Sequence, residues 1–265
     1  MLNKSKKEVS FRGGGFVPKP ILYIGPIVFV VIIGFLEWGT STGWISDLTL
    51  PKPSGVFQVF IELYDSGLLY KHLMPSLTRL LVGSFLGITF GIAVGLLIGL
   101  FNLVRAGLLP VVAALFPIPK IALLPLFVIW FGIDEGSKYA LIALGTFMPT
   151  IVATYAAIDN VDRNFIRMGQ SFGLTWISIV RKIILPGALP GILSGVRISL
   201  AIGIILLVAA EMLGATYGIG AYVLEAGSLY DLERLFAGVT ILSIIGVIIN
   251  WSVGVVERKL LIWRN

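Results

Sequence analysis

Six apolar stretches alternate with shorter polar segments along the chain. They cover residues 20–36, 80–101, 106–131, 140–157, 191–210 and 235–256. A bilayer core of about 30 Å requires about 20 apolar residues in a helix, and backbone polar groups cannot stay unpaired in lipid. The pattern therefore predicts an all-α polytopic membrane protein with six transmembrane helices, preceded by a polar tail at residues 1–19.

The composition agrees with a membrane protein. Hydrophobic residues make up 57% of the chain and charged residues 13%, with a mean hydropathy of +0.98, whereas soluble domains carry about 25% charged residues. The chain has no cysteine and one histidine. A disulfide or thiol chemistry is therefore excluded, and a metal site built on Cys or His is not expected.

The distribution of Lys and Arg predicts the orientation in the membrane. With a cytoplasmic N-terminus, the inner segments hold thirteen of these residues and the outer segments four, namely Lys52, Lys71, Lys138 and Arg234. Cytoplasmic loops carry such an excess. Both termini are therefore expected in the cytoplasm. The net charge of +6 follows from this bias, and no nucleic-acid partner is expected.

The second apolar stretch carries a glycine every four residues, at Gly83, Gly87, Gly91, Gly95 and Gly99. Residues four apart share one helix face, and small residues there let two helix backbones approach closely in a membrane. We expect this face to pack against another helix of the same chain, with a contact between subunits as the alternative.

The third stretch, 106–131, is interrupted by Pro110, Pro117, Pro119 and Pro125, which excludes one straight helix. Broken helices at membrane depth are buried in protein or line a wet cavity. Lys120 lies in this break, and a charge inside the membrane suggests a functional site. Lys120, Arg197 and Glu211 are therefore the candidate residues of a substrate pathway. For Lys120, reaching the membrane surface or pairing within the chain is the competing interpretation.

The polar segment 160–187, between the fourth and fifth stretches, is basic and amphipathic. Phe165, Met168 and Phe172 share one helical face, and Gly173 suits the left-handed residue that ends a helix. A second short helix from Trp176 is expected to end at Pro186. Two such helices would form a knob with exposed apolar groups, which usually mark a partner site. A helix lying on the membrane surface is the alternative.

Gly173, Ile183, Leu185 and Pro186 follow the order Gly-x9-Ile-x-Leu-Pro. This order resembles the second half of the motif Glu-Ala-Ala-x3-Gly-x9-Ile-x-Leu-Pro, found in permeases of ABC importers. The segments LPKPS, PIPKIALLPL, WFGI, LPGALP and AAEM, which occur in this order through the chain, are similar to the nitrate/sulfonate/taurine branch of binding-protein-dependent permeases. The first half of the motif departs from the family, since Arg167-Met168-Gly169 stand where Glu-Ala-Ala is usual.

The resemblance implies a type I ABC importer permease fold, similar to the methionine permease, with residues 20–265 forming the transmembrane domain. It also implies the permease subunit of an ATP-driven importer in a bacterial inner membrane, moving a small anion such as a sulfonate, taurine or nitrate by alternating access. The chain would pair with a second permease, as a homodimer or with a related chain. Two ATP-binding subunits, which carry ATP and Mg²⁺, and an extracytoplasmic solute-binding protein would complete the complex. The expected contacts to the ATPase are Arg167, Met168, Gly169, Phe172, Gly173, Trp176, Ile183, Leu185 and Pro186.

Two rival classes are less consistent with the residues. A secondary transporter or channel working without an ATPase would leave the polar knob unexplained. An intramembrane hydrolase built on Ser194 would need a base within hydrogen-bond reach, and the single histidine, His72, lies far from it in sequence. ATP hydrolysis by this chain is not expected either, because it contains no Gly-Lys pair and hence no phosphate-binding loop. The chain is therefore expected to be a transport subunit and not an enzyme, with no cofactor of its own.

Overall fold

The computed structural model of the protein describes residues 23–262, which form helices and connecting turns only. The predicted all-α class is therefore confirmed. The chain divides into two compact units, the first ending at Gly55 and the second beginning at Val56.

The first unit contains α1 (Ile24–Ser41), an apolar helix with most of its side chains exposed. The rings of Phe35, Trp38 and Trp44 gather at the end of this helix, with centroids 5.9–6.4 Å apart. The Glu37 carboxylate accepts hydrogen bonds from the backbone N–H of Ser54 at 2.9 Å and from its hydroxyl at 2.8 Å. These bonds hold the connection after α1 against the helix.

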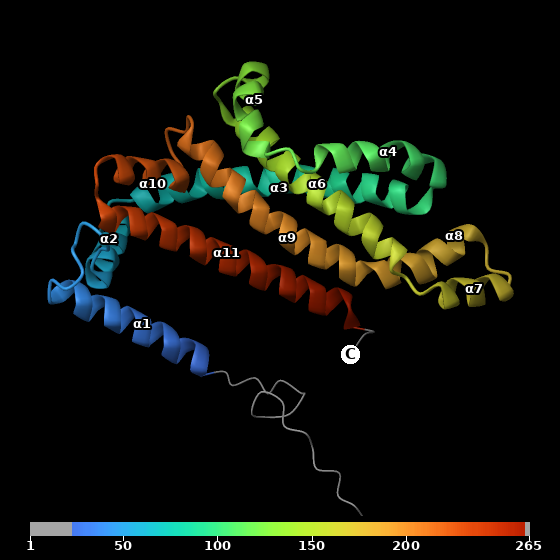
Figure 1. The fold of residues 1–265 in the computed structure, drawn as a ribbon, viewed down its shortest axis with the longest axis horizontal. Coiled ribbons are helices and arrows are strands. Elements are labelled where there is room, and N and C mark those ends of the chain that lie inside the picture. Colours follow the sequence, from blue (N-terminus) through green and yellow to red (C-terminus); the bar gives the residue numbers. More distant parts are fainter. Residues whose placement is uncertain (1–22, 263–265) are drawn as a thin grey trace, which may run out of the picture. The chain divides into compact units, whose positions relative to one another are not determined.

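The second unit is a bundle in which α3, α6, α9 and α11 are the long helices (Figure 1). The helices after α1 are α2 (Pro53–Asp65), α3 (Leu68–Leu100), α4 (Asn102–Leu115), η1 (Lys120–Leu123), α5 (Leu124–Phe131), α6 (Glu135–Asp159), α7 (Arg163–Ser171), α8 (Trp176–Ile179), η2 (Val180–Ile184), α9 (Leu185–Met212), α10 (Ile219–Ser228) and α11 (Leu232–Leu260). Within this unit, α7 and α8 lie at one end and α10 lies at the other.

The glycine face of α3 packs directly against α6. A Cβ atom at Gly87 would lie 2.2 Å from the carbonyl oxygen of Ala143, and one at Gly91 or Gly95 would meet Thr150 or Thr154 within 2.7 Å. Such short distances leave no room for any side chain. Gly83 and Gly99 make the same approach to Ile142 and Ile158, so all five glycines serve contacts within the chain.

The third apolar stretch is broken where its prolines predict. Helix α4 ends at Leu115, η1 starts at Lys120, and the two halves of the stretch are bent by 89°. Pro110 lies inside α4 without ending it, whereas Pro125 occupies the first turn of α5, where a missing N–H costs nothing.

Within residues 23–262, five helices are long and apolar enough to cross a membrane, and the bent pair adds a sixth if it crosses as one span. Large apolar side chains remain exposed along them, for example Phe85 (70%), Ile205 (67%) and Val247 (69%). In a membrane, lipid would cover an exposed apolar surface of this extent. The helices extend beyond the apolar stretches, since α3 starts at Leu68 and α6 at Glu135.

Candidate functional site

The polar segment after α6 forms a compact helical knob. Asp162 caps the start of α7, its carboxylate accepting the Asn164 N–H at 2.8 Å. At the other end Gly173 adopts φ +71°, its N–H donates to the Gln170 carbonyl at 2.9 Å, and the Leu174 N–H donates to the Gly169 carbonyl at 3.0 Å. This is the Schellman arrangement, in which a left-handed residue reverses the chain. The predicted role of Gly173 as helix terminator is therefore confirmed by its geometry.

Gly169 of α7 is buried inside the knob. A Cβ atom there would lie 2.8 Å from the Cδ1 of Ile183, so any larger side chain would push the two segments apart. The two halves of the sequence motif, the small residue at position 169 and the isoleucine at 183, thus pack on each other. This contact explains the spacing between them.

The second helix of the knob does not end at Pro186, contrary to the sequence-based expectation. Helices α8, η2 and α9 run on without interruption from Trp176 to Met212. Pro186 falls in the first turn of α9, directly after the π-helical turn Val180–Ile184. A proline lacks the N–H and its ring crowds the carbonyl one turn earlier, and the wider π turn relieves both constraints.

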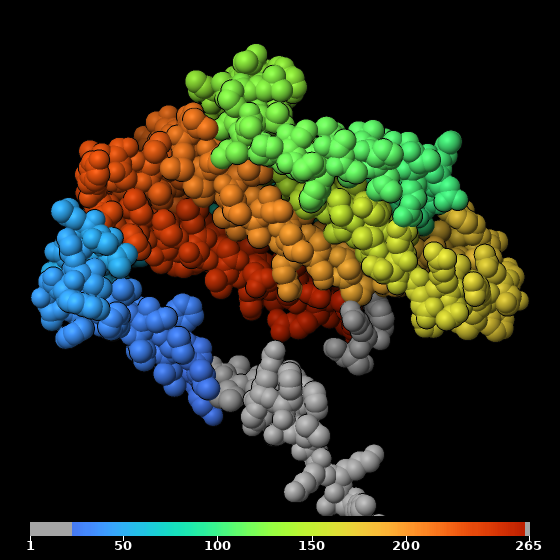
Figure 2. Space-filling model, viewed as in Figure 1, coloured from blue at the N-terminus to red at the C-terminus, as the bar shows by residue number. Residues whose placement is uncertain are grey.

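The knob exposes a cluster of apolar side chains. Phe165, Met168, Phe172, Trp176 and Ile177 are each 50–79% exposed. The knob stands at the end of the second unit, where Figure 2 shows it in yellow. The Trp176 ring also lies 5.5 Å from that of Phe101, which ties α8 to the turn between α3 and α4. Arg167 is exposed on α7 beside this cluster.

The opposite end of the bundle contains a buried charge cluster. Arg79 of α3, 3% exposed, donates from Nη1 to Glu211 Oε1 at 2.8 Å and to the Tyr217 carbonyl at 2.6 Å. Its Nε and Nη2 donate to the two oxygens of Glu135 at 2.6 and 2.5 Å. The bidentate pair joins α3 to the start of α6, and the Glu211 contact joins α3 to the end of α9.

Glu211 is fully enclosed and fully hydrogen-bonded. Besides Arg79 it accepts the Ser76 hydroxyl at 2.7 Å and the Gly220 N–H at 2.8 Å. Gly218 (φ +153°) lies against this pair, since a Cβ atom there would be 2.5 Å from the Glu211 Cδ and 2.7 Å from the Arg79 Nη1. The charge of Glu211, a residue expected from the sequence to line a substrate pathway, is therefore compensated inside the protein.

Lys138 lies one turn beyond Glu135 and is 3% exposed. Its Nζ donates to the backbone carbonyls of Ile133 at 2.9 Å and Asp134 at 3.1 Å. Arg79, Glu135 and Lys138 together line a cavity of about 680 Å³. This cavity opens at the α10 end of the bundle.

The three predicted pathway residues do not come together. Lys120 donates to the Phe116 carbonyl and lies over the Phe116 ring, in an otherwise apolar pocket. Arg197 pairs with Glu257 of α11 at 2.7 Å. Arg197 and Glu211 are 14 residues apart on one helix, which separates them by about 21 Å. This geometry does not favour a shared contact of the three residues with one small substrate.

Sequence reasoning missed Arg79 and Glu135 as site residues. Arg79 directly precedes the second apolar stretch, and Glu135 lies in none of the motif segments. The available signal was the position of Arg79 within α3, three residues after Ser76 and seven after His72. These positions place all three on one helix face.

Long apolar helices with exposed apolar flanks and a broken span define the class as a multi-pass membrane protein. Residues 68–262 match the family described as binding-protein-dependent transport system inner membrane component. The chain belongs to this family, so it is the permease subunit of a binding-protein-dependent ABC importer in the inner membrane, and the ATPase is a separate chain.

Several curated relatives are similar over most of their length. The putative aliphatic sulfonates transport permease protein SsuC of Bacillus subtilis (strain 168) is 37% identical, over 91% of this chain and 87% of the relative. The taurine transport system permease protein TauC of Escherichia coli (strain K12) is 38% identical, over 83% and 82%. The formylaminopyrimidine transport permease protein ThiX of Halalkalibacterium halodurans is 31% identical, over 91% and 96%.

Solved structures confirm the fold. An inward-facing structure of the MetNI methionine ABC transporter matches with a TM-score of 0.62 and 24% identity, covering 73% of this chain and 96% of that one. An amino acid ABC transporter matches with a TM-score of 0.61 and 15% identity, over 76% and 97%. The predicted type I importer fold is therefore correct.

Proposed function

We propose that the permease imports a small sulfonate, such as taurine or an aliphatic sulfonate, at the expense of ATP. The observation that carries this proposal is the identity of 37–38% to permeases named for these substrates, over 83–91% of the chain. Nitrate and other small anions belong to the same proposal. A formylaminopyrimidine is the second candidate, because the formylaminopyrimidine permease is 31% identical over a similar length.

The complex that we propose contains two permease copies, or this chain and a related one, with two ATP-binding subunits that carry ATP and Mg²⁺. An extracytoplasmic solute-binding protein delivers the substrate. The thirteen-to-four distribution of Lys and Arg supports a cytoplasmic knob and cytoplasmic termini. The α10 end of the bundle then faces the solute-binding protein.

The knob is the proposed docking site for the ATPase. Its exposed residues Phe165, Met168, Phe172 and Trp176 would enter the ATPase surface, and Arg167 would pair with an acidic or carbonyl group there. Gly169, Gly173, Ile183, Leu185 and Pro186 would keep the knob in shape. Because α8 continues into α9, a displacement at Trp176 is carried along roughly 55 Å of helix to the Arg79–Glu211 pair.

Coupling requires that ATP and the loaded binding protein favour different conformations of the bundle. In this proposal the Arg79–Glu135 contact holds the outer end closed, because it joins α3 to α6 where Glu135 is still half exposed. Movement of α9 by the ATPase would separate these helices and admit the substrate. Contact of Lys120 with the substrate stays a prediction.

The test is uptake by proteoliposomes that contain the permease, its ATPase and its solute-binding protein. We expect uptake of radiolabelled taurine that requires both ATP inside and the binding protein outside, and no ATP hydrolysis by the permease alone. Uptake of formylaminopyrimidine without sulfonate uptake would contradict the substrate, and ATP-independent uptake would contradict the mechanism.

A further inference from the structure

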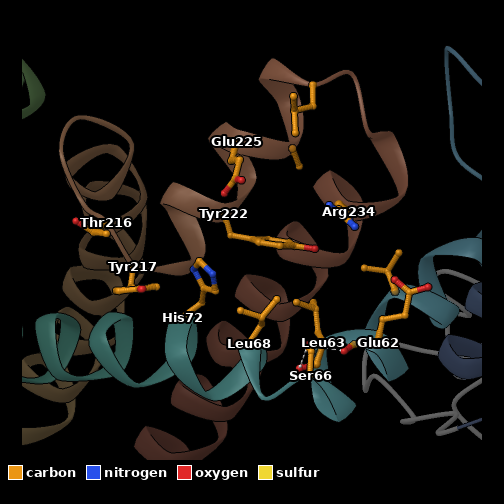
Figure 3. Close-up of a pocket in the computed structure, with 13 residues that line it drawn as sticks. Glu62, Leu63, Ser66, Leu68, His72, Thr216, Tyr217, Tyr222, Glu225 and Arg234 are labelled. Atoms are coloured by element: carbon orange, nitrogen blue, oxygen red, sulfur yellow. Dashed lines mark hydrogen bonds between the residues drawn. The ribbon is translucent and has the colours of Figure 1, made fainter.

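A second cavity, of about 410 Å³, lies at the α10 end. It lies between the end of α2, the start of α3, α10 and the start of α11 (Figure 3). Its polar lining consists of Glu62, Ser66, His72, Thr216, Tyr217, Tyr222, Glu225 and Arg234. A volume of this size admits a long side chain or a small molecule.

Tyr222 presents an unsatisfied polar group to this cavity. The side chain reaches across it from α10 with the hydroxyl on the side of Arg234 (Figure 3). Tyr222 is 8% exposed, and its hydroxyl has no hydrogen-bond partner among residues 23–262. Burial raises the pKa of Tyr222 to about 12, so the hydroxyl is neutral at physiological pH. A buried hydroxyl without a partner costs free energy that a bound polar group would recover.

The charges around the cavity favour a cation. Glu62 and Glu225 are exposed at its wall, and within the described residues neither carboxylate is paired with a Lys or Arg. Arg234, the one cationic side chain of the lining, is already held by Asp231 at 3.3 Å. Two free carboxylates therefore face one neutralised guanidinium, which leaves the cavity negative.

The aromatic side chains of the wall suit the same ligand. The His72 ring lies 5.8 Å from that of Tyr217 and 5.3 Å from that of Tyr222. Aromatic faces attract ammonium and guanidinium groups, and planar guanidinium also stacks on them. Carboxylates at the wall and rings beside them are a combination that recognises Lys or Arg.

The position of the cavity connects it to the buried charge cluster. His72 bonds to Gly218 through Nδ1 at 3.0 Å, and the Tyr217 carbonyl accepts from Arg79. Both residues therefore line the cavity and hold the loop that covers Arg79 and Glu211. A group entering the cavity would press on this loop, as expected for a partner whose docking opens the outer end.

We propose that this cavity is a socket for a Lys or Arg side chain of the solute-binding protein. The inference rests on the proposed function, since it needs the α10 end to face outward. It adds the sign of the charge on the partner and the residues that receive it, Glu62 and Glu225 at the wall with Tyr222 at the centre.

Binding of the solute-binding protein to the full transporter in lipid nanodiscs tests the socket, measured by biolayer interferometry at low and high salt. The double variant Glu62→Gln/Glu225→Gln should raise the dissociation constant about tenfold at low salt and weaken its salt dependence. Tyr222→Phe should raise it less, with salt dependence unchanged. Glu233→Gln is the matched control, an acid in the first turn of α11 that does not line the cavity, and should bind like the wild type.

An unchanged dissociation constant in the double variant would overturn the socket while leaving the proposed function intact. An equal loss in Glu233→Gln would also overturn it, because general electrostatics would then explain the effect. Saturable binding of arginine amide to the permease alone, indifferent to the binding protein, would mark a small-molecule site instead. No binding by the wild-type transporter would contradict both the socket and the proposed function.

Discussion

Arg79 is the residue on which the α10 end of the bundle depends most. Arg79 is 3% exposed, and its guanidinium lies between the carboxylates of Glu211, whose side chain is fully buried, and of Glu135, whose side chain is 47% exposed. Removing one partner from a buried ion pair leaves an uncompensated charge in a medium of low dielectric constant. The two carboxylates should therefore differ sharply in their contribution to stability.

Glu211→Gln should lower the free energy of unfolding by about 3 kcal/mol. A glutamine there would also turn its NH₂ group toward Ser76, Gly220 or Arg79, all of which donate to Glu211. Glu135→Gln should lower the free energy of unfolding by about 1 kcal/mol or less, because solvent screens the Arg79–Glu135 pair. Thermal unfolding in detergent, followed by tryptophan fluorescence, compares the two. Equal shifts would contradict the assignment of Glu211 as the buried anchor.

The sequence could not predict this pairing. Glu135 is 56 residues from Arg79 and Glu211 is 132 residues away, and no local pattern links them. Local sequence patterns predicted the structure correctly where its physical cause is local. The glycines of α3 repeat every four residues, and Gly173 terminates its own helix. Glu211 follows an apolar stretch with no local pattern that identifies its distant partners.

At the scale of elements, the contact of α3 with α6 determines the core of the bundle. The Gly87→Ala substitution should destabilise the protein by roughly 1–3 kcal/mol, because its Cβ would lie 2.1 Å from the Thr146 hydroxyl and 2.2 Å from a backbone oxygen. Gly107→Ala is the matched control on α4, where nothing lies within 4 Å of the added atom, and it should be neutral or slightly stabilising. The unfolding temperatures of the two variants, measured together, test this prediction. An unchanged unfolding temperature for Gly87→Ala would show that the α3–α6 spacing is adjustable.

The knob formed by α7 and α8 should depend on the left-handed conformation at Gly173. Gly173→Trp should abolish ATP-driven uptake while the protein still reaches the membrane, because φ +71° is strained for a bulky residue and the side chain would project from the knob surface. Gly173→Asn should keep most uptake, since asparagine tolerates this conformation. Uptake in proteoliposomes measures both, and normal transport by Gly173→Trp would contradict the importance of this turn.

Helix ends were predicted less well than helix identity. Helix α3 begins at Leu68, twelve residues before its apolar stretch, because His72, Ser76 and Arg79 are buried by partners from distant elements. Helix α9 passes Pro186 because the preceding π turn accommodates the missing N–H. Apolar content identifies the part of a helix that lipid or core covers, whereas its ends are decided by tertiary contacts that the local sequence does not contain.

At the scale of the whole molecule, α9 connects the knob with the charge cluster at the other end of the bundle. The continuous helix from Trp176 to Met212 begins in the exposed knob and ends at the Glu211–Arg79 pair. One continuous run of helix thus links the knob to the charge cluster. In the proposed mechanism, this continuity couples an ATPase at the knob to the opening of a substrate route at the other end.

Site-directed cross-linking at the knob tests the docking of the ATPase most directly. The chain has no native cysteine, so a maleimide–benzophenone probe can be attached at a single introduced site. Phe172→Cys, at a position that is 79% exposed on the knob, should cross-link to the partner ATPase in the assembled transporter. Tyr230→Cys, 84% exposed at the α10 end, should not. Cross-linking to the ATPase from position 230, or none from position 172, would contradict the account.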